Sequence, residues 1–288
     1  MSRTLGVAAV QMDVSVGDAN FSRMCDKIEE ISKHFPWAKL IIFSEKCIHG
    51  PGMNLAQPVP GEMSNQLCEV AREYGKWIIP GSMSEKTKEG IYNTAFVINP
   101  QGEIVAKYRK MFPWRPIEKC LSGSEFCVFD IPGCARVGLT ICYDQWFPEV
   151  CRQLVWMGAE IICNPILTAT SDRIPEIIIS QANAIVNQVY FVSVNGLNDG
   201  GNGHSLIIDP NGRILQEAGE IEQIMPEIID LDLVTRVREH GTIGMSQVLK
   251  SFKYEDHKFP VYAEGIDKGD GFKKLGSLEY KKEIIEGI

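Results

Sequence analysis

The chain has 288 residues, 44% of them apolar and 23% charged, a composition typical of a globular protein long enough for one large α/β domain or two small ones. The formal net charge of −8 argues against a nucleic acid or an anionic membrane as a partner, because both favour a basic protein face. No apolar run approaches the ~20 residues of a membrane span, and a strand expected from Leu5 leaves no room for a secretion signal, so we expect a cytoplasmic protein.

Strand-like and helix-like segments alternate along the first half, which is typical of an α/β fold. The pattern predicts, in chain order, a strand at 5–10, a helix at 20–34, a strand at 40–45, a helix at 62–74 and a strand at 77–83. Two further strands follow within 92–110, joined by a tight turn at Pro100-Gln101-Gly102.

The second half repeats this order. A strand is expected at 136–144, a helix at 147–157, a strand at 159–165, a helix at 174–188, a strand at 190–196 and a strand pair within 204–218. The stretch NTAFVINPQGEIV resembles HSLIIDPNGRIL about 110 residues later, and the strands LIIFSE and EIICNP correspond at a similar offset. Because this repeat is too long for a solenoid unit, it indicates one domain built from two related halves.

These elements predict a four-layer αββα sandwich with an internal pseudo-twofold repeat, in which two sheets stack face to face and helices cover the outside. Strands buried on both faces should be continuously apolar, as IIF, EIIC and YFVSV are. The predicted domain spans residues 1–262. The polar, Gly-, Lys- and Glu-rich segment 263–288 is expected to be a tail that packs on the surface or on a partner subunit.

The nine cysteines are odd in number, scattered and never spaced as CxxC, so neither a disulfide framework nor a metal site is indicated. Most are expected to be small buried side chains. Cys142 differs from the others and is a candidate nucleophile. It ends an apolar strand just before a predicted helix, and the first backbone amides of that helix would point at the negative charge that develops in a reaction. The alternative at this position is a structural cysteine.

Two charged residues also follow strand-like runs. Glu45 ends LIIFSE, and a carboxylate there is unfavourable to bury unless it is paired. Lys110 ends the second strand of the first pair and precedes the bulky segment Met111-Phe112-Pro113-Trp114. A solvated loop acid and a surface lysine are the simpler alternatives. Together with Cys142, however, these residues would supply a base, an electrostatic clamp and a nucleophile.

None of the five histidines is an obvious base for a thiol: His34 falls in a helix, His240 and His257 in the C-terminal part, and His49 and His204 are more simply explained as loop residues. A buried carboxylate can instead accept the thiol proton. Lys110 and the backbone N–H of Tyr143 would then stabilise an oxyanion, and one such donor typically contributes ~3 kcal/mol in the transition state. Glu118, a further acid in the Pro-rich loop after Lys110, could also lie nearby. Two carboxylates, Glu45 and Glu118, would disfavour a resting thiolate, so we expect proton transfer at the moment of attack.

These segments, over roughly residues 5–233, resemble the nitrilase (carbon–nitrogen hydrolase) superfamily, whose catalytic set is Glu, Lys and Cys. The resemblance implies that Glu45 is the general base, Lys110 the oxyanion stabiliser and Cys142 the nucleophile, with no cofactor. It also implies a homodimer or higher homo-oligomer that pairs through the helices after the nucleophile strand. Apolar positions there fit either that interface or the intramolecular core: Val150, Leu154, Val155 and Met157.

Within the superfamily, KYRKMFPWRPIEKCLSG is similar to a segment of aliphatic amidases and formamidases. That likeness implies that Glu118 is a second carboxylate that positions substrate or water, and that Trp114 is a wall of a small acyl pocket. It makes Asp144 a supporting acid beside the nucleophile. A nitrilase proper would be expected to have Cys-Trp-Glu where this chain has Cys142-Tyr143-Asp144, so nitrile hydrolysis is disfavoured.

Two departures bear on the substrate. The amidases place a tyrosine after the base, whereas this chain has Lys46-Cys47, and DQWFPE after Tyr143 is similar to N-carbamoyl amine amidohydrolases. We therefore expect an amidase acting on small linear amides, with an N-carbamoyl amine or amino acid amidohydrolase as the alternative and a non-catalytic scaffold as a third hypothesis. The pocket is expected to depend on the following residues: Lys46, His49, Trp114, Trp146 and the loop 168–175.

Overall fold

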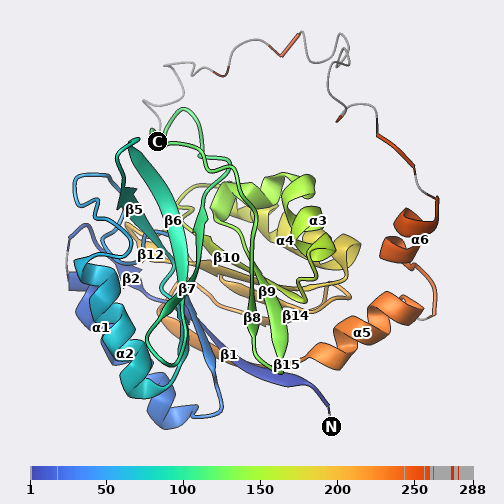
Figure 1. Ribbon diagram of the computed structural model, residues 1–288, viewed down its shortest axis with the longest axis horizontal. Coiled ribbons are helices and arrows are strands. Elements are labelled where there is room, and N and C mark those ends of the chain that lie inside the picture. The colour runs from blue at the N-terminus through green and yellow to red at the C-terminus, as the bar shows by residue number, and fades with distance from the viewer. Residues whose placement is uncertain are drawn as a thin grey trace.

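The computed structural model describes residues 2–17, 19–242, 244–255, 257–259, 262, 274–275 and 278. Most strands belong to two large sheets (Figure 1). The first sheet has the spatial order β15 (Gln223–Asp230), β1 (Thr4–Gln11), β3 (Leu40–Phe43), β4 (Trp77–Ile79), β6 (Ile91–Ile98) and β5 (Ser82–Lys86), with β7 (Ile104–Arg109) also paired to β6. The second has the order β14 (Ile214–Glu217), β13 (Leu206–Ile208), β11 (Tyr190–Asn195), β10 (Ile161–Ile166), β9 (Ala135–Leu139) and β8 (Cys127–Ile131).

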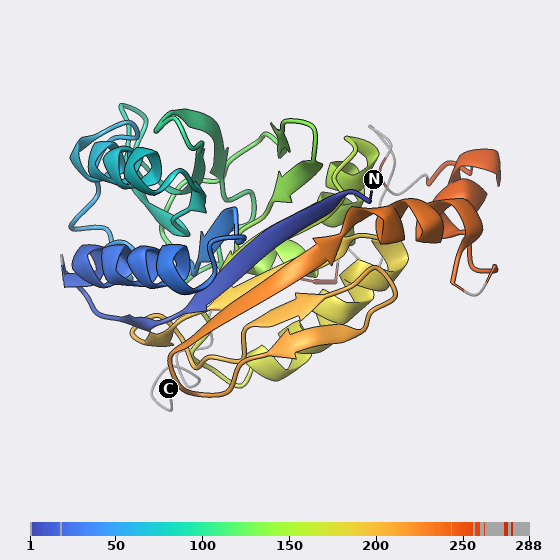
Figure 2. The ribbon, with the colours of Figure 1, turned by 90° about the horizontal axis from the view of Figure 1, so that it is seen from below.

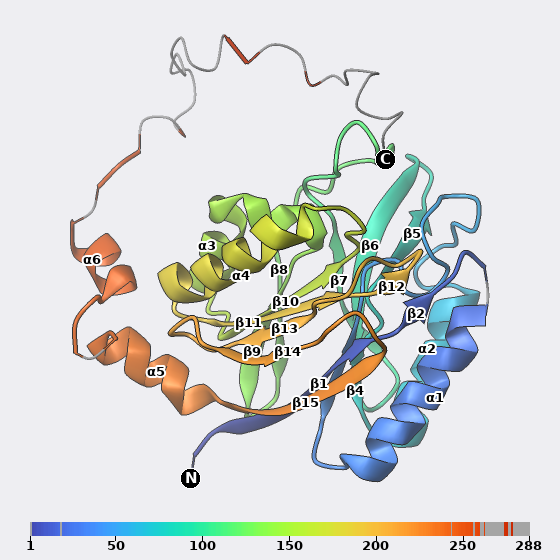
Figure 3. The same cartoon turned by 180° about the vertical axis from the view of Figure 1, so that it is seen from behind.

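Helices cover the outer face of each sheet (Figures 1 and 3). The helices on the first sheet are α1 (Ala19–His34) and α2 (Glu62–Tyr74), and those on the second are α3 (Pro148–Trp156) and α4 (Arg173–Asn187). The remaining elements are a short 3-10 helix, η1 (Cys142–Trp146), the two-stranded pair β2 (Asp13–Val14) and β12 (Leu197–Asn198), and the C-terminal helices α5 (Leu231–His240) and α6 (Val248–Glu255).

Three separate apolar cores fill the spaces between these layers. One lies between the two sheets, one between the first sheet and α1 and α2, and one between the second sheet and α3 and α4. Strand β3 shows why its sequence is continuously apolar: Leu40 and Ile42 belong to the central core, and Ile41 and Phe43 to the helix-facing one. The expected four-layer αββα sandwich is confirmed.

The internal repeat is visible in the pairing of the strands. Strands β1, β3 and β4 run parallel and β6 is antiparallel to β4, while β9, β10 and β11 run parallel and β13 is antiparallel to β11. An antiparallel strand also lies beside the first strand of each half, namely β15 on β1 and β8 on β9. Figure 2 shows β1 and β15 running side by side along the molecule.

The structure tests two further expectations. The strand predicted at 77–83 is two strands, because the chain turns at Pro80-Gly81, where Gly81 has φ +79° and a Cβ would lie 1.7 Å from the Ser44 carbonyl oxygen. Val150, Leu154 and Val155 are buried in the core beneath α3, which supports the intramolecular alternative for these positions. The predicted tail, 263–288, lies outside the described residues apart from 274–275 and 278.

Candidate active site

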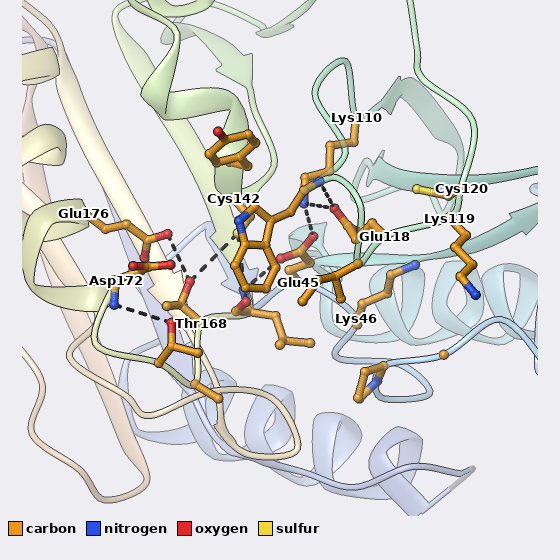
Figure 4. Close-up of a pocket in the computed structure, with 18 of the residues that line it drawn as sticks. Glu45, Lys46, Lys110, Glu118, Lys119, Cys120, Cys142, Thr168, Asp172 and Glu176 are labelled. Atoms are coloured by element: carbon orange, nitrogen blue, oxygen red, sulfur yellow. Dashed lines mark hydrogen bonds and ion pairs between the residues drawn. The ribbon is translucent and has the colours of Figure 1, made fainter. Parts of the chain in front are cut away.

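Glu45, Lys110 and Cys142 come from strands of both sheets and meet at one cavity (Figure 4). Strand β3 ends two residues before Glu45, β7 one residue before Lys110, and β9 three residues before Cys142. The cavity has a volume of about 490 Å³, and it is also lined by four more of the expected residues: Trp114, Glu118, Tyr143 and Trp146. Among the residues expected to take part in catalysis or to position substrate or water, Asp144 is the one that does not line it.

Lys110 bridges two carboxylates at the floor of the cavity. Its Nζ lies 2.9 Å from Glu45 Oε1 and 2.6 Å from Glu118 Oε2. Asn93 Nδ2 donates to both of the same side chains, at 2.6 Å to Glu45 and 3.0 Å to Glu118. The backbone N–H of Leu167 donates to the other oxygen of Glu45 at 2.8 Å. These bonds fix the position of every charged group at the floor.

The electrostatics favour an ammonium and a carboxylate at neutral pH. Burial alone would lower the pKa of Lys110, but attraction to Glu45 and Glu118 and the hydrogen bond to Glu118 outweigh it and raise that pKa well above its usual value. Burial would raise the pKa of Glu118, but Lys110 lowers it overall. An ammonium has three N–H donors, so Lys110 keeps one after bonding to the two carboxylates.

Cys142 begins η1 with an unusual backbone conformation. Its φ of 49° is in the left-handed region, and the side chain is only 7% exposed. Burial, followed by the negative charge of Glu45, raises the pKa of the thiol well above its usual value, although Lys110 opposes the shift. The cysteine therefore rests as a neutral thiol, as the sequence predicts.

The resting thiol points towards the loop after β10. Its Sγ lies 3.9 Å from the Leu167 carbonyl oxygen and 3.9 Å from Thr168 Oγ1, whereas no hydrogen bond joins it to Glu45. In this resting state the thiol and the Glu45 carboxylate therefore line the same cavity without a direct hydrogen bond between them.

Behind Thr168 lies a buried ion pair that sequence reasoning missed. Thr168 Oγ1 donates to Glu176 Oε1 at 3.0 Å, and Arg173 Nη1 lies 3.3 Å from Glu176 Oε2. Both charged side chains are buried, and Glu176 lines the cavity. Because the Thr168 hydroxyl gives its only hydrogen to Glu176, its oxygen faces Cys142 as an acceptor. The Arg-x-x-Glu spacing at the start of an expected helix was the available clue.

Asp144 connects the segments around the cavity through hydrogen bonds. Its fully buried carboxylate accepts hydrogen bonds from Tyr108 Oη at 2.7 Å, Phe112 N at 2.9 Å and Ile141 N at 3.0 Å. It thereby ties the start of η1 to the segments on either side of Lys110. Burial raises the pKa of Asp144 to about 6, even though Lys110 and these hydrogen bonds oppose the shift.

Most of the pocket residues expected from sequence line the cavity, and the exceptions are His49 and positions 171 and 173–175 of the expected loop. Lys46, Trp114, Trp146 and the segment 168–170 line the cavity, together with Asp172. His49 does not; it lies beside a much smaller separate void bordered by 50–52 and Ser84. Asn93 was also missed, because an asparagine inside an expected strand carries no pattern of its own.

No group of three or more His, Cys, Asp or Glu side chains is arranged to hold a metal ion within the part of the chain that the structure describes. In that same part, no helix is both long and apolar enough to cross a bilayer.

Comparison with known proteins gives the class. The family described as carbon-nitrogen hydrolase matches residues 6–239, so the chain belongs to this family, in the nitrilase superfamily, and is a hydrolase of the amidase type that acts on carbon–nitrogen bonds. It is 30% identical to the omega-amidase NIT2 of Bos taurus over 82% of this chain and 92% of that protein. It is also 30% identical to the omega-amidase NIT2 of Homo sapiens, over 81% and 91% of the two chains.

Solved structures share the fold. Nit3 of Saccharomyces cerevisiae, a member of branch 10 of the nitrilase superfamily, superimposes with a TM-score of 0.77 at 26% identity, covering 83% of this chain and 94% of that one. A carbon-nitrogen hydrolase from Helicobacter pylori G27 gives a TM-score of 0.77 at 23% identity, covering 88% and 98%.

Proposed function

We propose that this protein is an amidohydrolase that converts small linear amides to carboxylic acids and ammonia through a thioester on Cys142. The observation that carries this proposal is the arrangement at the cavity floor, where one buried ammonium bridges two carboxylates beside a buried neutral thiol. The omega-amidase names of two relatives that the chain matches over most of their length support amide hydrolysis as the reaction.

In the first half-reaction, Cys142 Sγ bonds to the amide carbonyl carbon while its proton passes to Glu45. The oxyanion that forms accepts the third N–H of Lys110 and the backbone N–H of Tyr143, which lies in the first turn of η1, where the first amides lack intrahelical partners. The C–N bond then breaks and Glu45 returns the proton to the nitrogen. Ammonia departs, and the acyl group remains bound to Cys142 as a thioester.

In the second half-reaction, a water molecule attacks the thioester carbonyl while Glu45 takes its proton. The same two donors stabilise the second oxyanion. The C–S bond breaks, the sulfur takes the proton back from Glu45, and the carboxylic acid leaves. In this proposal Glu118, which accepts a hydrogen bond from Lys110, orients the water.

The test uses purified protein with Cys142→Ala and Cys142→Ser, and with Cys25→Ser on α1 as the matched control. The substrates are formamide, acetamide, propionamide, a nitrile and an N-carbamoyl amine, with ammonia and carbon dioxide both measured. We expect ammonia without carbon dioxide from the amides, no turnover of the nitrile, and loss of activity only at Cys142. Ammonia release by either Cys142 variant near the wild-type rate would rule out the mechanism.

Carbon dioxide released with ammonia from the N-carbamoyl amine would assign the alternative function and exclude simple amides as the preferred class. Modification of Cys142 by an electrophile no faster than the other cysteines, with no turnover of any substrate, would indicate a non-catalytic scaffold.

A further inference from the structure

The Thr168 side chain contacts the thiol of Cys142 on one side and a buried ion pair on the other (Figure 4). Its Oγ1 lies 3.9 Å from Cys142 Sγ and donates to Glu176 Oε1 at 3.0 Å. The ion pair, formed by Arg173 and Glu176, takes no part in the steps of the proposed reaction. It can therefore act on the nucleophile only through the Thr168 hydroxyl or through its own charge.

The backbone of Thr168 is held independently of Glu176. Its N–H donates to Asn195 Oδ1 at 3.0 Å, and Asn195 Nδ2 donates to its carbonyl oxygen at 3.0 Å. Asn195 is the last residue of β11, so these bonds tie the loop after β10 to the second sheet. The contact with Glu176 therefore sets the direction of the hydroxyl hydrogen, whereas Asn195 sets the position of the loop.

The Glu176 carboxylate is in turn held by Arg173. Arg173 Nη1 lies 3.3 Å from Glu176 Oε2, and Nη2 donates to Ser193 Oγ at 3.2 Å and to the His204 carbonyl oxygen at 2.5 Å. Burial raises the pKa of Glu176, and the Arg173 guanidinium opposes this shift because it favours the carboxylate. A guanidinium held at three points thus occupies one oxygen of Glu176 and leaves the other for Thr168.

Glu176 is one of several charges around the thiol. Burial is the main cause of the raised pKa of Cys142, and the negative charges of Glu45, Glu176 and Glu118 add to it, while Lys110 opposes it. Glu176 differs from the other two acids because it is connected to the thiol through the Thr168 hydroxyl. The charged groups of the surrounding elements and of the cavity are Glu45 and Lys46 after β3, Lys110, Glu118 and Lys119 after β7, Asp144 in η1, Asp172 before α4, and Arg173 and Glu176 in α4.

We propose that Arg173 and Glu176 are positioning residues that fix the Thr168 hydroxyl as an acceptor towards Cys142, so that the nucleophile keeps its proton until it attacks. A hydroxyl has one hydrogen, and while Glu176 accepts it, Thr168 cannot donate to the sulfur and stabilise a thiolate. The retained proton is the one that passes to Glu45 and then to the leaving nitrogen. This inference rests on the proposed function, in which Cys142 is the nucleophile.

Glu176→Gln tests the direction of this hydrogen bond at almost constant shape. The Arg173 guanidinium has only donors, so it should pair with the amide oxygen, and the amide nitrogen then donates to Thr168 Oγ1. The Thr168 hydrogen is thereby free to donate to the Cys142 sulfur, which favours the thiolate. A hydrogen bond to a charged group predicts that methyl methanethiosulfonate modifies Cys142 about 10- to 100-fold faster at neutral pH, as measured by mass spectrometry of the peptide that contains Cys142.

Three comparisons separate the hydroxyl from the charge. In a Thr168→Val background, which has no hydroxyl, the acceleration caused by Glu176→Gln should be smaller by at least about threefold. Arg173→Met/Glu176→Met removes two opposite charges together and frees the same hydroxyl, so it should also accelerate modification, and it serves as the test if Glu176→Gln does not fold. Asp172→Asn is the matched control: this acid lines the same cavity just before α4 but is partly exposed, so it should change the rate less than about threefold.

The pH profile of turnover gives a second readout. With propionamide, kcat/KM should decline at a lower pH in Glu176→Gln than in the wild type, because Cys142 loses its proton to solvent at a lower pH. A modification rate unchanged in both neutral variants, an equal acceleration with and without the Thr168 hydroxyl, or an equal effect of Asp172→Asn would overturn the role of the pair. Modification of the thiol does not require hydrolysis, so failure of the wild type to hydrolyse any amide would contradict only the proposed function.

Discussion

Replacement of Lys110 by methionine tests the central feature of the site. The variant removes the ammonium that bridges Glu45 and Glu118 but keeps most of the side-chain volume. At 2.9 and 2.6 Å, each ion pair corresponds to a Coulomb energy of about 6 kcal/mol at an effective dielectric constant of about 20. Desolvation of the three groups offsets much of this, and breaking a buried pair by removing one partner typically costs about 3–5 kcal/mol.

We therefore expect Lys110→Met to lower the free energy of unfolding by about 3–5 kcal/mol, because two carboxylates are left together without a counter-ion. We also expect kcat to fall by about 10²- to 10³-fold or more, because the proposed oxyanion donor is lost. Urea denaturation followed by circular dichroism measures the first effect, and ammonia release from propionamide measures the second.

The double variant Lys110→Met/Glu118→Gln separates the two effects. Removing one of the unpaired charges should recover a substantial part of the lost stability, whereas activity should stay low because no donor is restored. Recovery of kcat in the double variant, or a Lys110→Met protein as stable as the wild type, would contradict our account of the cavity floor.

Three further predictions concern the surroundings of the thiol. Burial and the charge of Glu45 raise the pKa of Cys142 above its usual value, so less thiolate is present at any given pH. The rate at which methyl methanethiosulfonate modifies Cys142 should therefore keep increasing through pH 9. A rate that reaches a plateau below pH 8 would refute the raised pKa. Thr168→Val should destabilise the fold by about 1–3 kcal/mol and slow turnover, because Glu176 loses a hydrogen-bond donor and the Cys142 thiol loses an acceptor. Thr168→Ser keeps the hydroxyl and should have near wild-type stability and turnover. Equal stability and turnover of the two variants would contradict the role of the Thr168 hydroxyl. The folded-state pKa of Asp144, about 6, exceeds its unfolded value, so its stabilising effect is complete below about pH 4 and is lost as pH rises through 6, a change of up to about 3 kcal/mol. Denaturation of wild type and Asp144→Asn at pH 4 and 7 should show that the variant lacks this part of the pH dependence, and identical pH dependences would refute it.

The layers of the fold could be predicted from the sequence because they depend on the apolar pattern within each segment. Successive side chains of a strand point to opposite faces of the sheet, so a continuously apolar segment such as LIIF indicates a strand that is covered on both faces. The repeated order of strands and helices then indicates two equivalent halves. The strand break at Pro80-Gly81 had a local signal, because Pro-Gly dipeptides mark turns, but the apolar residues on either side favoured one strand.

The candidate site was predicted in the same way but less completely. Glu45, Lys110 and Cys142 stand out because each follows a strand, and strand ends gather at the edges of sheets. Asn93 and Glu176 lack such a position: one lies inside β6 and the other in the first turns of α4, where neither residue type is unusual. Their contacts with Glu45 and Thr168 join residues from separate elements that only folding brings together.

The sequence by itself determined the αββα architecture, the repeat and the three charged or nucleophilic residues at strand ends, because these follow from the periodicity of apolar side chains and from residue order. Only the tertiary structure decided that Lys110 bridges both carboxylates, that the thiol faces Thr168, and that Lys46 is buried in the wall of the cavity. These features depend on distances between side chains from different elements and on the burial of each charge. Both quantities are set by how the two sheets pack, and a linear pattern does not encode them.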